Sequence, residues 1–253
     1  MSTSPASLPI WSRPEPGTRK ARFSREQIAA AALTIADAEG FEAVSMRRIA
    51  AELGAGTMSL YRYISGKDDL VALLDDALMG ESLVPDGTLP SDWRAALAVI
   101  ARQTRAAYLR HPWAVAWLQG RAAGAQGGSF GPNAMRHFEQ SLAALDSAPL
   151  DTAARLDLLA IVDDFVFGNV LRTGELQSRS SAAATAASAE RAAAIMEFAQ
   201  EMLATGQFPR TAALAGDPAA AALADPAAQD TRFEHGLALL LDRAAAMTAG
   251  PAG

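Results

Sequence analysis

The chain has 253 residues, a formal net charge of −6 and 50% hydrophobic residues, enough apolar material for more than one small domain. It contains no cysteine, which excludes disulfide frameworks and thiolate metal sites. No apolar run approaches the roughly 18 residues of a membrane span, and the amino terminus lacks the apolar core of a signal peptide. We therefore expect a soluble, cytoplasmic protein. Alanine is abundant while aromatic residues make up 6% of the chain, which favours an all-α fold of closely packed helices.

The first 22 residues are rich in proline, serine and glycine, a composition typical of a disordered arm. Arg19, Lys20 and Arg22 make the end of this arm basic. They could follow a DNA minor groove, or the whole arm could be a solvated tail. Trp11 is unusual in such a segment, and the composition does not indicate where it packs.

The first predicted helix begins after Ser24. Ser24 and Gln27 have the spacing of a capping box, and Phe23 and Ile28 are placed as a hydrophobic staple around it. An apolar stripe at helical spacing continues from Ile28 until Gly40, where we expect the helix to end.

The stretch SMRRIAAELGAGTMSLYRYISGKDDL, residues 45 to 70, predicts two short helices around a glycine-bearing turn. Ser45 is the expected N-cap of the first helix, whose periodicity turns Arg47 and Arg48 outward. Gly54 and Gly56 can supply the sharp connection, because glycine adopts positive φ without a steric penalty.

In the second of these helices, apolar residues four positions apart form an inner stripe and leave a mixed outer face. That outer face carries Met58 and Arg62, flanked by Ser59 and Tyr61. A thioether, a guanidinium, a hydroxyl and a phenol can meet thymine methyls, base-edge acceptors and phosphates in a major groove. Two surface helices of an ordinary helical domain would show the same pattern. Only the flanking sequence can distinguish such helices from a DNA-binding helix-turn-helix.

The net charge divides unevenly along the chain. Residues 1–67 contain nine Lys or Arg against six Asp or Glu, whereas residues 68–253 contain 13 against 22. Positive charge is thus concentrated where the predicted helix-turn-helix would meet phosphates.

The stretch FSREQIAAAALTIADAEGFEAVSMRRIAAELGAGTMSLYRYISGKDDLVALLDDAL, residues 23 to 78, resembles the amino-terminal domain of TetR-family transcriptional regulators without a gap. The EGFEAVSMRRIAAELG block, the LYRYI core and the K-x-x-L entry into the next helix are its most specific parts. The resemblance implies base contacts from Arg47 and phosphate contacts from Ser45, Tyr63 and Lys67. It also implies that Thr57, Met58, Ser59 and Tyr61 lie in the groove. The DNA-binding candidates are therefore Ser45, Arg47, Arg48, Thr57, Met58, Ser59, Tyr61, Arg62, Tyr63 and Lys67.

Further helices are predicted downstream of the head by periodicity and by turn residues. They cover residues 67–79, 93–110, a short stretch from residue 113, a helix opened by Pro132, and then 150–177, 182–205 and 231–247. A glycine cluster near residues 124–131 predicts a loop, and the Pro- and Ala-rich residues 206–230 predict a mobile excursion. The expected domains are a disordered arm (1–22), a helix-turn-helix domain (23–80) and a helical ligand-binding and dimerisation domain (81–253).

The carboxy-terminal half resembles the tetracycline-repressor-like regulatory domain of the same family, through RHPWAVAWL, GPNAMRHFEQSLAAL and LLAIVDDFVFGNVLRTGE. This implies a homodimer joined by a four-helix interface, with one ligand cavity in each subunit. Aromatic, thioether and polar side chains suit the walls of such a cavity, although core or dimer packing would also account for them. The ligand-binding candidates are Trp113, Trp117, Phe130, Met135, Phe138, Asp164, Phe167 and Asn169.

Asp163 and Asp164 lie within an otherwise apolar helix, so each must find water, a cation or a hydrogen-bond partner. Capping of a neighbouring helix and an intersubunit pair are alternatives to ligand contact. Phe165 is a further pocket candidate on the same helix.

Enzymatic functions are disfavoured. His111, His137 and His235 are far apart, none stands in a metal-binding pair or beside an evident nucleophile, and the glycine cluster lacks a phosphate-loop signature. We expect no catalytic residues, no metal and no cofactor. The predicted function is a sequence-specific transcriptional regulator, a repressor released from a palindromic operator by a small-molecule effector. A helical ligand-binding or adaptor protein without operator binding is the alternative, and a ligand-independent or activating regulator is a further one.

Overall fold

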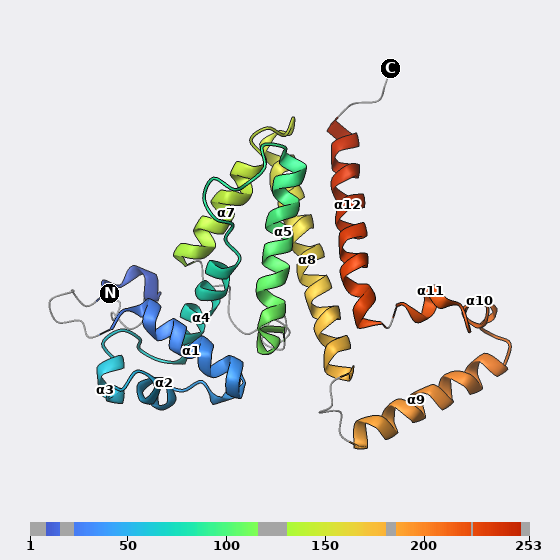
Figure 1. Cartoon of the computed structure of the whole chain (residues 1–253), viewed down its shortest axis with the longest axis horizontal. Coiled ribbons are helices and arrows are strands. Elements are labelled where there is room, and N and C mark those ends of the chain that lie inside the picture. Colours follow the sequence, from blue (N-terminus) through green and yellow to red (C-terminus); the bar gives the residue numbers. More distant parts are fainter. Residues whose placement is uncertain (1–8, 16–22, 116–130, 181–185, 224, 249–253) are drawn as a thin grey trace, which may run out of the picture.

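The computed structural model describes residues 9–15, 23–115, 131–180, 186–223 and 225–248. Over these ranges the secondary structure is helical and contains no strand, which confirms the all-α class. Figure 1 shows a small group of helices near the amino terminus joined by one helix to a larger group of longer helices. Over the described ranges, no helix is both long enough and apolar enough to cross a membrane.

The head consists of α1 (Arg25–Glu39), the 3-10 turn η3 (Phe41–Ala43), α2 (Met46–Glu52) and α3 (Thr57–Leu60). The predicted capping box is present: Ser24 Oγ accepts a hydrogen bond from the Gln27 N–H, and Gln27 Oε1 accepts one from the Ser24 N–H. Gly40 ends α1 as predicted, with a φ of 87° that favours glycine.

The linking helix α4 (Lys67–Glu81) extends the predicted helix by two residues. It packs against α1 of the head and against α5 (Trp93–Arg110) and α7 (Pro132–Ala144) of the larger domain. Its buried leucines share one continuous hydrophobic core with residues of both parts. A displacement of α4 would therefore change the packing of both the head and the larger domain.

The larger domain continues with α8 (Thr152–Ser180), α9 (Ala186–Ala204) and α12 (Gln229–Thr248), close to the predicted ranges. Figure 1 shows α8 between α5 and α12, and α5 and α12 each contact it. The predicted excursion is more structured than expected, since it contains α10 (Pro209–Ala212), α11 (Pro218–Ala221) and the 3-10 turn η4 (Pro226–Ala228). Prolines at the first positions favour these turns, and Asp217 caps α11 by accepting from the Ala219 N–H.

The expectation of a disordered arm fails for residues 9–15. They include a 3-10 turn, η2 (Ile10–Ser12), and Ile10 is buried in the core of the head. Trp11 packs partly buried against the same core, which answers where this side chain goes. Burial of two large apolar side chains holds the segment in place against the entropy of an open arm. Arg19, Lys20 and Arg22 lie outside the described residues.

Candidate DNA-binding interface

The helix-turn-helix begins at Ser45, whose side chain accepts a hydrogen bond from the Arg48 N–H as predicted for an N-cap. Gly54 has a φ of 61°, so the turn requires a glycine there. Gly56 plays a different part from the one predicted, since its φ of −79° is open to other residues and it stands as the N-cap of α3.

The recognition segment is the regular helix α3 followed by a turn, in which Leu60 O accepts hydrogen bonds from the N–H groups of Tyr63 and Ile64. Leu60 and Ile64 are fully buried and anchor the segment, as their spacing predicted. Met58 projects from the opposite side with 78% exposure, and Tyr61 flanks it with 49% exposure. Large apolar groups held at the surface by a buried stripe are available for contacts with bases.

The basic residues of this surface differ in their exposure to solvent and in their ion pairs. Arg47, Arg62 and Lys67 are exposed. Arg48 pairs with Glu39 at 2.8 Å and with Glu52 at 2.9 Å, and these hydrogen bonds raise its pKa. The charge of Arg48 is thus balanced within the head, which makes it less available for a DNA contact than the other arginines of the surface.

Tyr63 was predicted to bind phosphate, but its ring is buried in the head. Its hydroxyl oxygen lies 3.3 Å from the Phe23 N–H, from which it accepts a hydrogen bond. A phosphate contact by Tyr63 would therefore involve the hydroxyl group alone.

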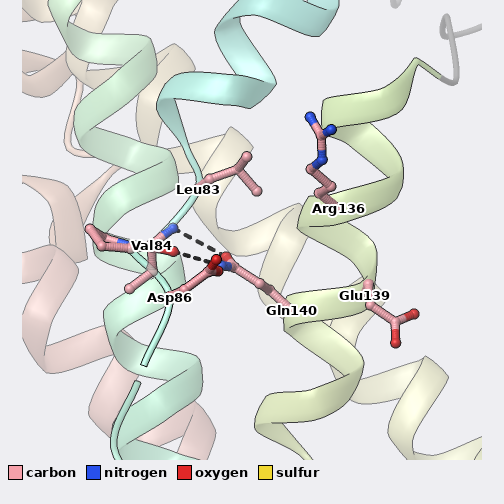
Figure 2. Close-up of a pocket in the computed structure, with 7 residues that line it drawn as sticks. Leu83, Val84, Asp86, Arg136, Glu139 and Gln140 are labelled. Carbon is pink, nitrogen blue, oxygen red and sulfur yellow. Dashed lines mark hydrogen bonds between the residues drawn. The ribbon is translucent and has the colours of Figure 1, made fainter. Parts of the chain in front are cut away.

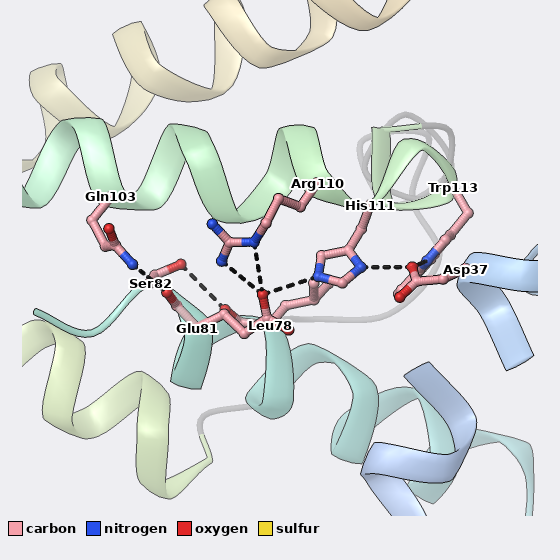
Figure 3. A network of polar contacts seen from close by, with 8 residues as sticks. All are labelled: Asp37, Leu78, Glu81, Ser82, Gln103, Arg110, His111 and Trp113. Atoms are coloured by element: carbon pink, nitrogen blue, oxygen red, sulfur yellow. Dashed lines mark hydrogen bonds and ion pairs between the residues drawn. The ribbon is translucent and has the colours of Figure 1, made fainter. Parts of the chain in front are cut away.

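A polar network joins the head to the linking helix and to the larger domain (Figure 3). His111, at the end of α5, places Nδ1 2.6 Å from Asp37 Oδ1 of α1 and Nε2 3.1 Å from Glu81 Oε2 of α4. Arg110 also binds Glu81 Oε2, through Nη2 at 2.7 Å. Desolvation raises the pKa of Glu81, but the hydrogen bonds from Arg110 and His111 outweigh it, so this pKa lies below its usual range. A neutral imidazole can donate to one carboxylate only, whereas a protonated ring can donate to both.

Trp113, one of the predicted pocket residues, takes part in this junction. Its indole N–H donates to Asp37 Oδ1 at 2.7 Å, and its ring stacks on Phe41 of the head with centroids 5.8 Å apart. Lys67 Nζ lies 6.0 Å from the centroid of the Phe41 ring. Trp113 therefore connects the chain after α5 to the head, next to a predicted phosphate ligand.

A second junction joins α4 to α7 through the buried carboxylate of Asp76. Asp76 Oδ1 accepts from the N–H groups of Asn133 and Ala134 at 2.8 and 3.2 Å, and so caps the first turn of α7. A Cβ at Gly131 would lie 2.2 Å from Asp76 Oδ1, so only glycine fits there. Burial raises the pKa of Asp76 against the opposing effect of the two backbone hydrogen bonds.

Within the described ranges, the remaining ligand-binding candidates have different surroundings. Phe167 packs edge-on against Tyr108, and Asn169 Oδ1 accepts from Arg105 Nε at 2.6 Å. Met135 and Phe138 are exposed on α7, and Asp164 is exposed on α8. Trp117 and Phe130 lie outside the described residues.

Two titratable groups with shifted pKa values lie on the same helices. Desolvation, followed by the charge of Asp164, raises the pKa of Asp163 to about 6. Desolvation lowers the pKa of His137, whose Nε2 lies 2.9 Å from Thr104 Oγ1.

Phe165, a further pocket candidate, stacks on Phe233 of α12, with centroids 5.4 Å apart, and so takes part in helix packing.

A groove of about 470 Å³ lies between the α4–α5 connection and α7 (Figure 2). Gln140 spans it, donating to Val84 O at 2.6 Å and accepting from the Val84 N–H at 3.1 Å. The groove is lined by Leu83, Val84, Pro85, Asp86, Arg136, Glu139 and Gln140. None of these residues is among the ligand-binding candidates. It is thus a different place from the effector cavity that the sequence predicted.

Comparison with known proteins agrees with the geometry of the head and of the larger domain. Residues 28–74 match the family model described as bacterial regulatory proteins, tetR family. Residues 86–247 match the one described as tetracyclin repressor-like, C-terminal domain.

Individual relatives cover most of the chain. The HTH-type transcriptional repressor DrrR1 of Streptomyces coeruleorubidus is 37% identical over 205 residues, which are 81% of this chain and 73% of that protein. The HTH-type transcriptional repressor Rv1353c of Mycobacterium tuberculosis is 28% identical over 240 residues, covering 90% of this chain and 84% of that protein. The structure of Streptomyces coelicolor ActR in complex with actinorhodin matches with a TM-score of 0.62 and 27% identity, over 92% of this chain and 100% of that chain. The chain belongs to the tetR family of bacterial regulatory proteins, and it is a DNA-binding transcriptional regulator.

Proposed function

We propose that the protein is a homodimeric repressor that binds a roughly palindromic operator and leaves it when a small-molecule effector binds the larger domain. The observation that carries the proposal is the recognition segment, where buried Leu60 and Ile64 hold Met58 and Tyr61 out toward solvent. This arrangement offers a rigid reading surface beside three exposed basic residues of the head, Arg47, Arg62 and Lys67.

In this proposal the outer face enters the major groove. Arg47 contacts bases, and Thr57, Met58, Ser59 and Tyr61 line the groove, while Ser45, Lys67 and the hydroxyl of Tyr63 bind phosphates. Two heads related by a twofold axis would read half-sites about 34–36 Å apart, which requires a roughly palindromic operator.

Release by an effector requires a path from the larger domain to the head, and the two junctions supply one. Asp76 fixes α4 to the first turn of α7, and His111 bridges α4 and α1. A ligand that shifts α7 or the end of α5 would therefore move α4 and α1 together and change the separation of the two heads. The effector and the operator must then lower each other's affinity by the same factor.

The effector is proposed to bind among α5, α7 and α8, near Phe167, Thr104 and His137. Support comes from the structural relative ActR, whose structure was solved in complex with actinorhodin. The match with ActR covers 92% of this chain and 100% of that chain. The identity of the effector for this chain is left to a ligand screen, scored by release from operator DNA.

The test is binding of the purified full-length protein to its own upstream intergenic DNA, compared with an unrelated fragment of equal length across a salt series. We expect specific binding and a steep salt slope, since phosphate contacts release counterions. Arg210→Ala removes an exposed arginine of α10 and serves as a control with unchanged binding. Equal weak binding to both fragments, together with no enriched motif in a selection from genomic fragments, would overturn the proposal and favour an adaptor role.

A further inference from the structure

Residues 9–15 form a segment that we call the N-terminal strap. It precedes the part of the chain that matches the tetR family model, which begins at residue 28. Ile10 is 1% exposed and belongs to the core cluster that also holds Leu60 and Ile64 of the recognition segment. Pro9 and Pro14 restrict the backbone on either side of the 3-10 turn. The strap thus contributes a buried side chain to the same hydrophobic core as the recognition segment.

Arg13 joins the strap to the loop between the recognition segment and α4. Its guanidinium donates to Ser65 Oγ and pairs with the carboxylate of Asp69 in the first turn of α4. Asp69 also accepts a hydrogen bond from the Ser65 N–H. The side chains of Arg13 and Asp69 are each only 13% exposed, so the pair is largely shielded from solvent and salt.

A second set of contacts joins the strap to α1 through Arg25. Arg25 Nη1 donates to the Arg13 carbonyl oxygen at 3.0 Å, and the Arg25 N–H donates to Glu15 Oε1 at 2.6 Å. Arg25 Nε donates to the Tyr63 carbonyl oxygen at 3.4 Å. The start of α1, the end of the recognition segment and the start of α4 therefore meet around one short stretch of chain.

We propose that the strap is a positioning element for operator binding, in which Arg13 paired with Asp69 fixes the loop from Ser65 to Lys67. The inference rests on the proposed function, because it concerns the phosphate contacts assigned to Tyr63 and Lys67. A loop that is already ordered in the free protein loses less entropy when DNA binds. Since phosphate contacts carry no base information, loss of the strap weakens binding to all sequences alike.

The competing role for Arg13 is direct contact with a phosphate after release from Asp69. The two roles predict opposite effects of Asp69→Asn. If Arg13 positions the loop, loss of the carboxylate charge weakens operator binding. If Arg13 contacts DNA, the same substitution frees the guanidinium and strengthens binding.

The test measures operator affinity of full-length Arg13→Ala, Asp69→Asn and the double variant across a salt series, with a mismatched operator alongside. We expect each single variant to bind about 10-fold more weakly, the double variant to lose little more, and the preference over the mismatched operator to stay unchanged. The salt slope stays at the wild-type value, whereas loss of a phosphate ligand lowers it by about one. Arg94→Ala breaks an exposed ion pair with Asp242 and is the matched control without effect.

A general loss of folding is separated from positioning by two further measurements. Titration with excess operator gives the active fraction of each variant, so affinities refer to folded protein only. Arg13→Lys keeps the charge but lacks the planar fork, and we expect its affinity to fall between those of Arg13→Ala and the wild type. Unchanged affinity in Arg13→Ala, or tighter binding by Asp69→Asn, overturns the strap proposal while the regulator stands. A wild-type protein without specific binding overturns the proposed function, and the strap proposal with it.

Discussion

Arg47 and Lys67 are both exposed basic residues of the head, yet we expect different consequences when each is removed. Arg47 lies on the outer face of α2, from which it can reach base edges, whereas Lys67 begins α4 at the edge of the surface. Arg47→Ala should relax discrimination at one operator position, at a cost of about 1–3 kcal/mol for the preferred base. Lys67→Ala should weaken binding to all sequences alike and lower the salt slope by about one.

Selection of bound sequences from randomised operators measures the effect of Arg47→Ala, and operator titration across a salt series measures that of Lys67→Ala. Arg210→Ala controls for the loss of a positive charge remote from the head. An Arg47→Ala variant that selects the wild-type sequence with wild-type stringency would remove Arg47 from the list of base-reading residues.

The orientation of the recognition segment could be predicted from sequence because it depends on local spacing alone. Leu60 and Ile64 stand four positions apart, and their burial determines that Met58 faces outward. The surroundings of Arg48 and Tyr63 could not be predicted in this way. Their partners are Glu39 and the backbone of Phe23, which only the folded head brings close.

Trp113 shows the same limit at the junction between the domains. Its sequence neighbours are apolar, which suits either a pocket wall or a packing contact. The contacts that decide its role are with Asp37 and Phe41, more than 70 residues earlier in the chain. No local pattern contains that information.

At the scale of helices, the cap that α4 provides to α7 is the contact with the sharpest prediction. Asp76→Ala leaves the Asn133 and Ala134 N–H groups without their buried acceptor, and we expect it to lower the free energy of unfolding by about 2–3 kcal/mol. Asp76→Asn keeps an acceptor oxygen, and it removes a buried negative charge that is costly to desolvate, as the raised pKa of Asp76 indicates. The free energy of unfolding should therefore fall less in Asp76→Asn than in Asp76→Ala. Urea denaturation followed by circular dichroism measures the difference.

Asp92→Ala is the matched control, because Asp92 caps α5 from an exposed position by accepting from the Ala95 N–H. It should cost only about 1 kcal/mol, as expected for an ordinary N-cap. Equal losses for the Asp76 and Asp92 variants would show that the α4–α7 junction adds nothing beyond a surface cap.

Most helix limits followed from sequence because caps and prolines stand at their ends, as at Ser24, Gly40 and Pro132. The α4–α7 junction was missed, although the sequence carried a signal for it: Asp76 interrupts an apolar stripe, and a buried carboxylate needs a partner. The order of the strap was not predicted, because the proline, serine and glycine content of residues 1–22 is typical of disorder. The two large apolar side chains of the strap are too few to change that composition. Its order depends on Ile10 filling a core that the other helices build.

At the scale of the whole molecule, α8 and α12 present the surface best suited to a second copy. Ile161 of α8 and Leu239 of α12 are 52% and 58% exposed on helices that pack side by side. The Arg94–Asp242, Arg102–Glu234 and Arg105–Asp230 ion pairs tie α12 to α5. Exposed large apolar residues on two long adjacent helices indicate a contact surface, and a four-helix arrangement of two α8–α12 pairs would cover it.

Leu239→Glu should therefore convert the proposed dimer to a monomer, because it would bury a charge at the centre of the shared surface. The monomer can engage one half-site only, so we expect operator affinity to fall by more than 10-fold while the helical content stays at the wild-type level. Analytical ultracentrifugation over a range of concentrations gives the association state, and operator titration gives the affinity. Leu214→Glu places the same charge on a side chain of 52% exposure outside α8 and α12, and it should leave both measurements unchanged. A Leu239→Glu protein that remains dimeric and binds its operator fully would place the contact between subunits on another face.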